Sequence, residues 1–330
     1  MQKKSYTFKI ILVLVIFVGL FLLLKKGGSF FSSSNDEEAS IKVEKNSILH
    51  MELSGVIMNG KKFIKNLKKY KKDSHVKAIV INVNSPGGAV GPSQEVYAEI
   101  KRAREETKKP IICVTTGIMA SGAYYSAVAC DKIVVAPGAL VGSIGVIMEF
   151  ANLSKLYDWA KVSRFTITSG KYKDSGNEFR EMREDEKSLF QDMIKEVYQQ
   201  FRSTVKESRK LKDEVLDQYA DGRVFTGTTA VKMGFADQEG TFEDAVQLAA
   251  KEANLGSDFE VIELPKKKRS IFDFGEANED DPVNSLGKNL AGLASLQGEA
   301  LKSAMNVILK TEYINQPMLI MPGFWKADEN

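Results

Sequence analysis

Histidine is nearly absent from this chain, which contains only His50 and His75 among its 330 residues. A hydroxyl nucleophile needs a general base beside it, and histidine fills that role most often. His50 lies in a strand-like run and His75 at a turn before the next run. A Ser-His-Asp triad stays geometrically open, because triads are assembled in space rather than along the chain. The scarcity of histidine makes lysine the next candidate for a general base.

Cysteine is equally scarce, with only Cys113 and Cys130. Two cysteines in a chain of this length do not imply a disulfide framework. Both lie among apolar or small residues, so we expect two buried thiols. The net charge of +3 gives no indication of a nucleic-acid partner.

Long apolar runs are missing except at the N-terminus, where Ile10 to Leu24 forms 15 consecutive apolar residues. With Tyr6 to Lys9 the segment reaches 19 residues, or about 28 Å of helix, close to the hydrocarbon thickness of a bilayer. A cleaved signal peptide is the alternative, but Lys25 and Lys26 follow the run and no small-residue cleavage site lies near. We expect an uncleaved anchor within residues 6–26. Lysines flank both ends, so charge leaves its orientation open.

The rest of the chain has the composition of a folded protein, with 43% apolar and 27% charged residues. We expect a cytoplasmic stub and anchor (1–26), a linker (27–46), a catalytic core (47–264) and a C-terminal extension of uncertain role (265–330). In the core, continuous apolar runs alternate with helical patterns, which predicts parallel βαβ units. The extension ends in the apolar run "INQPMLIMPGFW", which can dock on the core, on a neighbouring subunit or in a peptide groove.

Ser121 is a candidate nucleophile in "TTGIMASGAYYSAVACDKI". A lysine base must be uncharged, so its pKa must fall from about 10.4 to about 7–8 through burial or nearby cations. Most lysines lie in charged runs where this is implausible. In "FTITSGKYKDSG", however, a strand-like segment leads into a turn carrying Lys171 and Lys173. A rigid strand end can hold a lysine against the serine, although composition does not distinguish the two.

Glycines supply candidate donors for an oxyanion. "NVNSPGGAV" places Gly87 and Gly88 directly after a buried strand, and Gly122 follows the serine at the start of a helix. Backbone N–H groups at such positions can point at the developing negative charge. Taken alone, "SPGG" is typical of a tight turn, and Ser121 is typical of a small helix-packing residue.

Five segments together resemble the signal peptide peptidase A family, also called protease IV, of bacterial membrane-anchored serine proteases. They are "NSPGG", "MASGAYY", "GSIGVIME", "TSGKYKD" and "DGRVFTG", in this order, and the likeness spans about residues 47–250. The resemblance implies an α/β fold, the Clp protease/crotonase-like spiral of βαβ units. It also implies a Ser/Lys dyad in which Ser121 attacks and Lys173 accepts the proton, while Lys171 falls on a non-catalytic position.

The resemblance further implies oxyanion donors at Gly87, Gly88 and Gly122, and a hydroxyl at Ser143 that orients the lysine amine. The chain has one copy of the core, as in the short form of the family. This form implies a ring-like homo-oligomer, an octamer, whose active sites are shared between neighbouring subunits. The core would face the extracytoplasmic side of the bacterial cytoplasmic membrane and degrade signal-peptide remnants. No metal, cofactor or nucleic acid is expected.

Two other functions remain open. A crotonase-type acyl-CoA enzyme would use the same glycine amides for a thioester enolate, with an acidic residue and no nucleophilic serine. A catalytically silent membrane scaffold would only assemble partners. The anchor and the "TSGKYKD" segment argue against the first, and the intact Ser121 and Lys173 argue against the second.

Overall fold

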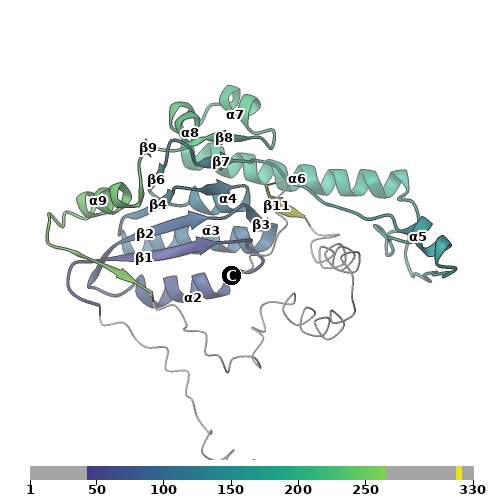
Figure 1. Cartoon of the computed structure of the whole chain (residues 1–330), viewed down its shortest axis with the longest axis horizontal. Coiled ribbons are helices and arrows are strands. Elements are labelled where there is room, and N and C mark those ends of the chain that lie inside the picture. The colour runs from purple at the N-terminus through teal and green to yellow at the C-terminus, as the bar shows by residue number, and fades with distance from the viewer. Residues whose placement is uncertain (1–42, 265–316, 322–330) are drawn as a thin grey trace, which may run out of the picture. The chain divides into compact units, whose positions relative to one another are not determined.

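The computed structural model of the chain describes residues 43–264 and 317–321 (Figure 1). The expected anchor at 6–26, most of the expected linker, and most of the C-terminal extension lie outside these residues. Within the described part of the chain, no helix is long and apolar enough to cross a membrane.

A six-stranded sheet forms the centre of the core, in the strand order β10-β1-β2-β4-β6-β9. Every neighbouring pair is parallel, as the alternation of apolar runs and helices predicted. The strands are β1 (Ser47–Ser54), β2 (Val76–Asn84), β4 (Ile111–Thr115), β6 (Lys132–Val135), β9 (Gln238–Glu239) and β10 (Glu260–Glu263). All residues of β4 are buried, because helices and loops cover both faces of the sheet.

Helices connect the strands and supply the apolar cover. The helix α9 (Phe242–Glu252) packs Ala245, Val246 and Ala249 against Val80 and Val114 on one face of the sheet. In α2 (Lys61–Tyr70), the buried residues are Phe63, Ile64, Leu67 and Tyr70, which form an apolar stripe along one side of the helix. The remaining helices are α3 (Val90–Thr107), α4 (Gly122–Ala127), α5 (Ser154–Trp159), α6 (Glu184–Arg209), α7 (Asp213–Tyr219) and α8 (Gly227–Met233).

Two small sheets lie beside the large one. In the first, β7 (Leu140–Gly142) pairs in parallel with β5 (Ile118–Ala120) and antiparallel with β8 (Val224–Thr226). In the second, β3 (Gly87–Ala89) pairs antiparallel with β11 (Met318–Ile320). The sequence predicted a loop at 87–89, and the structure makes it a strand because the C-terminal segment supplies a partner.

The strand expected in "FTITSGKYKDSG" is absent. All residues from 158 to 173 are exposed and none of them forms a strand. A strand is stable only when a neighbour satisfies its backbone groups, and none of the described residues pairs with this segment. Residues 154–183, called the arm below, extend beyond the end of α6 in Figure 1.

The expectation of two free buried thiols is also wrong. Cys113 in β4 and Cys130 just after α4 form a disulfide with a Cα–Cα distance of 6.0 Å. The bridged segments are held side by side, because Asp131 N–H donates to the Ile111 carbonyl (2.8 Å) and Ile111 N–H donates to Asp131 Oδ2 (2.9 Å). This proximity arises from the path of the chain around α4, and the spacing of two isolated cysteines does not reveal it.

Candidate active site

Ser121 occupies the turn from β5 into α4, with backbone angles of φ +51° and ψ −119°. A non-glycine residue in this region costs about 1–3 kcal/mol and is typical of a nucleophile on a sharp strand-to-helix turn. Its N–H donates to the Gly142 carbonyl at 2.7 Å, which fixes the turn. Its side chain is 0% exposed, and its Oγ has no hydrogen-bonding partner among the described residues. The structure therefore presents a strained, buried and unengaged hydroxyl.

Gly87 and Gly122 bring two segments into contact at this hydroxyl. A Cβ atom on Gly87, which has φ +104°, would lie 2.7 Å from the Gly122 nitrogen. The Gly87 N–H already donates to Ser85 Oγ at 3.1 Å, and Ser85 is fully buried. Of the three predicted oxyanion donors, Gly87 is therefore already bonded to a side chain. Among the described residues, no side chain accepts a hydrogen bond from the N–H of Gly88 or Gly122. Sequence inspection gave no signal for the part played by Ser85.

Close packing explains why glycine stands at the other two positions. A Cβ on Gly88 would lie 2.2 Å from the Ile57 carbonyl oxygen, and one on Gly122 would lie 2.3 Å from Ser93 Oγ. Ser93 is itself buried and donates to the Ala89 carbonyl at 2.9 Å. The backbone of this site is consequently held by contacts from the Ile57 region and from α3.

Ser143 lies beside Ser121. Ala120 and Gly142 pair at the ends of the parallel strands β5 and β7. The residues that follow them, Ser121 and Ser143, therefore leave the sheet at the same end. Ser143 also has a positive φ, +51°, and is almost fully buried. Its N–H donates to the Arg223 carbonyl at 2.8 Å. The structure therefore brings Ser143 together with Ser121 and the three glycines.

Lys173 is not part of this group. It lies in the arm, in a turn where its N–H donates to the Gly170 carbonyl at 3.1 Å, and its side chain is exposed. Its Nζ has no ion pair or hydrogen bond with the residues that the structure describes. Figure 1 draws the arm on the right, away from α4. Among the described residues of this one chain, no lysine forms a hydrogen bond with Ser121 Oγ.

Lys171 is held in its charged form, whereas a general base must be uncharged. Its Nζ lies 2.8 Å from Asp185 Oδ2. The hydrogen bond to Asp185, followed by one to Tyr172, raises the pKa of Lys171 above its ordinary value. A raised pKa keeps the amine charged, so the geometry gives no support to Lys171 as the general base.

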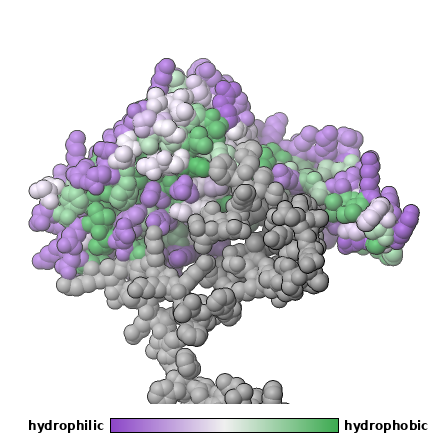
Figure 2. Space-filling model, in the orientation of Figure 1, coloured by the Kyte–Doolittle hydropathy of each residue, from purple (hydrophilic) through white to green (hydrophobic). Residues whose placement is uncertain are grey.

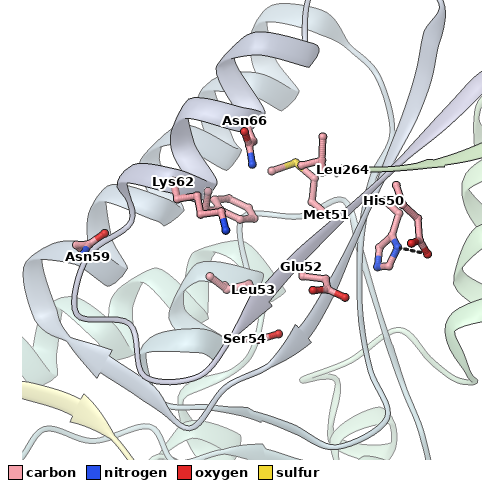
Figure 3. Close-up of a pocket in the computed structure, with 11 residues that line it drawn as sticks. His50, Met51, Glu52, Leu53, Ser54, Asn59, Lys62, Asn66 and Leu264 are labelled. Carbon is pink, nitrogen blue, oxygen red and sulfur yellow. Dashed lines mark hydrogen bonds and ion pairs between the residues drawn. The ribbon is translucent and has the colours of Figure 1, made fainter. Parts of the chain in front are cut away.

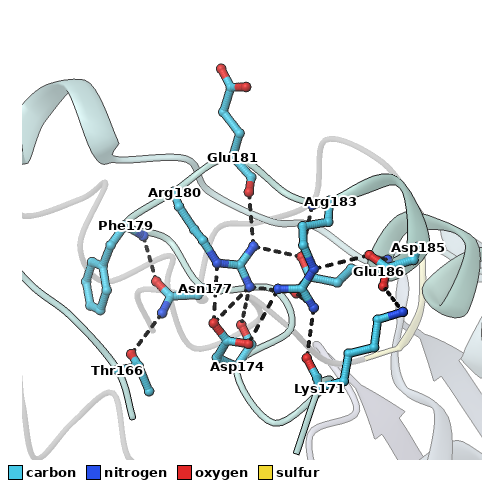
Figure 4. Close-up of polar contacts among 10 residues, drawn as sticks. All are labelled: Thr166, Lys171, Asp174, Asn177, Phe179, Arg180, Glu181, Arg183, Asp185 and Glu186. Carbon is cyan, nitrogen blue, oxygen red and sulfur yellow. Dashed lines mark hydrogen bonds and ion pairs between the residues drawn. The ribbon is translucent and has the colours of Figure 1, made fainter. Parts of the chain in front are cut away.

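A polar network fixes the turn that carries Lys173 (Figure 4). Arg180 Nη2 donates to Asp174 Oδ2 at 2.9 Å and to Glu186 Oε1 at 2.6 Å. Arg183 N–H donates to Glu186 Oε2 at 3.0 Å, which caps the start of α6. Glu186 is fully buried, and the hydrogen bond from Arg180 is the main reason that its pKa falls to about 2. Because Asp174 directly follows Lys173, this network holds the backbone turn from which the Lys173 side chain extends.

The apolar C-terminal run supplies a part of the site that sequence reasoning left undecided. Met318 N–H donates to the Ile147 carbonyl (2.9 Å), and Ile147 N–H donates to the Met318 carbonyl (3.0 Å). On the other edge, β11 pairs with β3, so the segment lies between β3 and Ile147. Its apolar composition was the only signal in the sequence. The sequence left three docking places open, namely the core, a neighbouring subunit and a peptide groove. The structure shows the segment paired with β3 of the core.

A separate cavity of about 320 Å³ lies between β1 and α2 (Figure 3). It is lined by His50, whose Nδ1 is 3.4 Å from Glu263 Oε1. The other histidine is His75, whose Nδ1 lies 3.7 Å from Asp73 Oδ1. Since Ser121 Oγ has no hydrogen-bonding partner in the part of the chain that the structure describes, neither histidine forms a triad with it. Among the described residues, no group of His, Cys, Asp or Glu side chains is arranged to hold a metal ion.

Comparisons with known proteins identify the family of the chain. A model of peptidase family S49 matches residues 103–256. A putative protease of Synechocystis is 37% identical over 248 residues, covering 74% of this chain and 88% of the relative. A putative protease of Methanocaldococcus jannaschii is 34% identical, covering 72% and 75%.

A putative signal peptide peptidase SppA of Enterococcus faecium is 34% identical over 205 residues, covering 62% of this chain and 59% of the relative. The mixed α/β fold with its parallel sheet fits the Clp protease/crotonase-like fold implied by the five sequence segments. On these grounds the protein belongs to peptidase family S49 and to its signal peptide peptidase A group of serine proteases.

Proposed function

We propose that this protein is a membrane-anchored serine endopeptidase with a Ser121/Lys173 dyad. The observation that carries the proposal is the state of Ser121, which is buried, strained and unengaged beside the Gly122 amide. A structural serine in a packed interior would normally hydrogen-bond to a carbonyl. An unsatisfied hydroxyl in a costly conformation is better explained by a chemical role.

The proposed reaction uses these groups in the following order. Lys173, uncharged, accepts the Ser121 Oγ proton while Oγ attacks the carbonyl carbon of the scissile bond. The Gly88 and Gly122 N–H groups stabilise the oxyanion. The Lys173 ammonium then protonates the leaving amine, and an acyl-enzyme remains. Lys173 next takes a proton from water, whose oxygen attacks the ester, and its return to Ser121 releases the acid.

We assign Lys173 to a neighbouring copy of the chain. The large apolar side chains that the arm exposes include Trp159 (79%), Phe165 (86%) and Ile167 (90%). Figure 2 shows apolar surface at the right-hand end of the molecule, where the arm lies. Exposed apolar clusters of this kind mark interaction surfaces. A ring of eight copies would bury them and bring each Lys173 to the Ser121 and Ser143 of the next subunit, where burial favours an uncharged amine.

Signal-peptide remnants are the proposed substrates, at the extracytoplasmic face of a bacterial cytoplasmic membrane. The name of the Enterococcus relative supports this choice. An extended peptide can bond to β3 on one side and to Ile147 on the other, the places that β11 takes here. Main-chain bonds provide affinity for extended peptides whatever their sequence. The anchor at residues 6–26 would keep the site close to membrane-released peptides.

The dyad is tested with the full-length protein in detergent and an apolar fluorogenic peptide. Ser121→Ala and Lys173→Ala should each abolish hydrolysis, whereas Lys171→Ala, the matched control two residues away, should retain it. Full activity of either dyad variant contradicts the proposal. Covalent labelling of Ser121 by a peptide-like inhibitor that reacts with nucleophilic serines distinguishes the peptidase from the crotonase-type alternative, which would bind CoA. A scaffold would show neither labelling nor CoA binding.

The sharing of sites has its own test. Coexpression of the Ser121→Ala and Lys173→Ala chains should restore about a quarter of the wild-type activity if copies mix at random around a ring. A dyad within one chain would give no restoration.

A further inference from the structure

Ser85 lies at the point where the strand before the nucleophile meets the glycine loop of the site. It directly follows β2 and is fully buried. Its N–H donates to the Ile118 carbonyl (2.9 Å), and its carbonyl accepts from the Ala120 N–H (3.2 Å). These bonds join Ser85 to β5, whose last residue, Ala120, directly precedes Ser121. The backbone of Ser85 therefore fixes the strand that leads to the proposed nucleophile.

The side chain of Ser85 holds the glycine loop itself. Its Oγ accepts a hydrogen bond from the Gly87 N–H at 3.1 Å and lies 3.5 Å from the Gly87 carbonyl oxygen. Pro86, between the two residues, has no N–H to donate. A serine hydroxyl that accepts a backbone N–H two residues later closes a tight turn in place of a carbonyl. One buried residue thus holds both the strand that leads to the nucleophile and the loop of the oxyanion donors.

The peptide unit between Gly87 and Gly88 determines where the Gly88 N–H points. The Gly87 carbonyl accepts a hydrogen bond from the Ile57 N–H at 2.8 Å. The carbonyl and the N–H of a planar trans peptide point in opposite directions. The Gly88 N–H consequently points away from Ile57, toward the other edge of β3. The direction of this proposed oxyanion donor therefore depends on the orientation of a single peptide unit.

Two glycines in a row give this peptide unit little stiffness of its own. Glycine populates positive and negative φ about equally, and Gly87 has φ +104° here. Removal of the Ser85 hydroxyl would take away the partner of the buried Gly87 N–H, and a buried donor without a partner is costly. Rotation of the backbone at Gly87 can relieve that cost, but it also redirects the Gly88 N–H. The hydroxyl of Ser85 is thus the contact that opposes this rotation.

We propose that Ser85 is a positioning residue for the reaction, whose hydroxyl keeps the Gly88 N–H aimed at the oxyanion. It acts through Gly87 rather than by contact with the substrate. Because its backbone also holds the strand that leads to Ser121, it keeps the nucleophile and the oxyanion donor at a constant separation. The proposal rests on the function proposed above, since it takes Ser121 as the nucleophile and Gly88 as a donor.

The test compares Ser85→Ala with wild type as full-length protein in detergent. The oxyanion exists in the transition state and not in the bound peptide, so kcat for the apolar fluorogenic peptide should fall about tenfold or more while KM changes less than about twofold. A peptide aldehyde, whose adduct with Ser121 carries an oxygen at the same place, should bind more weakly by the same factor. Ser47→Ala is the matched control and should keep the wild-type kcat, because Ser47 is also a fully buried serine whose Oγ bonds to the backbone, at the Glu44 carbonyl.

A second variant decides the question if Ser85→Ala does not fold. Ser85→Cys keeps the packing of the side chain, but a thiol is a weaker acceptor than a hydroxyl, so kcat should fall about threefold or more at unchanged KM. A merely structural role would lower the melting temperature and the fraction of active protein, while kcat per inhibitor-labelled Ser121 and the affinity for the aldehyde would keep their wild-type values. That result, or a wild-type kcat in both variants, overturns the inference.

The Ser121→Ala chain separates this inference from the function on which it rests. If Ser121→Ala is inactive and the Ser85 variants hydrolyse the peptide as fast as wild type, the peptidase stands and the positioning role of Ser85 fails. If Ser121→Ala hydrolyses the peptide as fast as wild type, both fail, because Ser121 then forms no oxyanion beside Gly88.

Discussion

Replacing Glu186 by Gln tests whether the polar network at the start of α6 holds the segment that carries Lys173. The substitution preserves shape but removes the charge that Arg180 and Arg183 contact. Lowering the pKa of Glu186 from 4.5 to about 2 corresponds to about 3 kcal/mol of preference for the carboxylate. Arg180 is partly exposed and keeps Asp174 as a partner, so water and Asp174 compensate in part. We therefore expect a loss of roughly 2–3 kcal/mol in local stability.

The lowered pKa also determines how the stabilisation by Glu186 changes with pH. The folded pKa of Glu186 is lowered, so its stabilisation is fully present well above the unfolded value of 4.5 and is lost as the pH falls toward about 2. At pH 3 less than half of the stabilisation by Glu186 should remain. The difference between wild type and Glu186→Gln should therefore be largest at neutral pH and shrink on acidification.

Hydrogen exchange followed by mass spectrometry measures this directly, on peptides covering residues 165–190 of the full-length protein. A loss of 2–3 kcal/mol corresponds to roughly 30- to 150-fold faster exchange of amides that exchange through local opening. Glu184→Gln is the matched control, since Glu184 is an exposed acid in the same first turn. Exchange in Glu186→Gln equal to that of the control at neutral pH would refute the reasoning.

Two further predictions concern the core of the site. Gly122→Ala should destabilise the protein by about 1–3 kcal/mol and abolish hydrolysis, because its Cβ would lie 2.3 Å from Ser93 Oγ; thermal unfolding should show partial recovery when Ser93→Gly is added, and equal stability of Gly122→Ala and wild type would contradict the clash. Reducing the Cys113–Cys130 disulfide, whose partners are 17 residues apart, should cost about 3 kcal/mol; thermal scans with and without reductant check this against a Cys113→Ala, Cys130→Ala chain, and labelling of two free thiols in the unreduced denatured protein would contradict the bridge.

Local pattern was sufficient for most of the core. The apolar runs from Val76, Ile111 and Lys132 became parallel strands, because a strand buried on both faces reads as continuous apolar sequence. The apolar stripe of Phe63, Ile64, Leu67 and Tyr70 likewise accounts for the helix at 61–70. The failures were at 87–89 and 165–168, where a strand exists or not according to a partner far away in the chain.

The sequence by itself determined the residue types of the chemistry. The shortage of histidine directed attention to lysine, and the order of short glycine- and serine-rich segments predicted Ser121, Gly88 and Gly122. The tertiary structure alone placed Ser143 beside Ser121, ion-paired Lys171 with Asp185, and seated Leu319 at the glycines. The physical reason is that residue type and spacing are local properties, whereas the engagement of a side chain depends on which distant segments the fold brings against it.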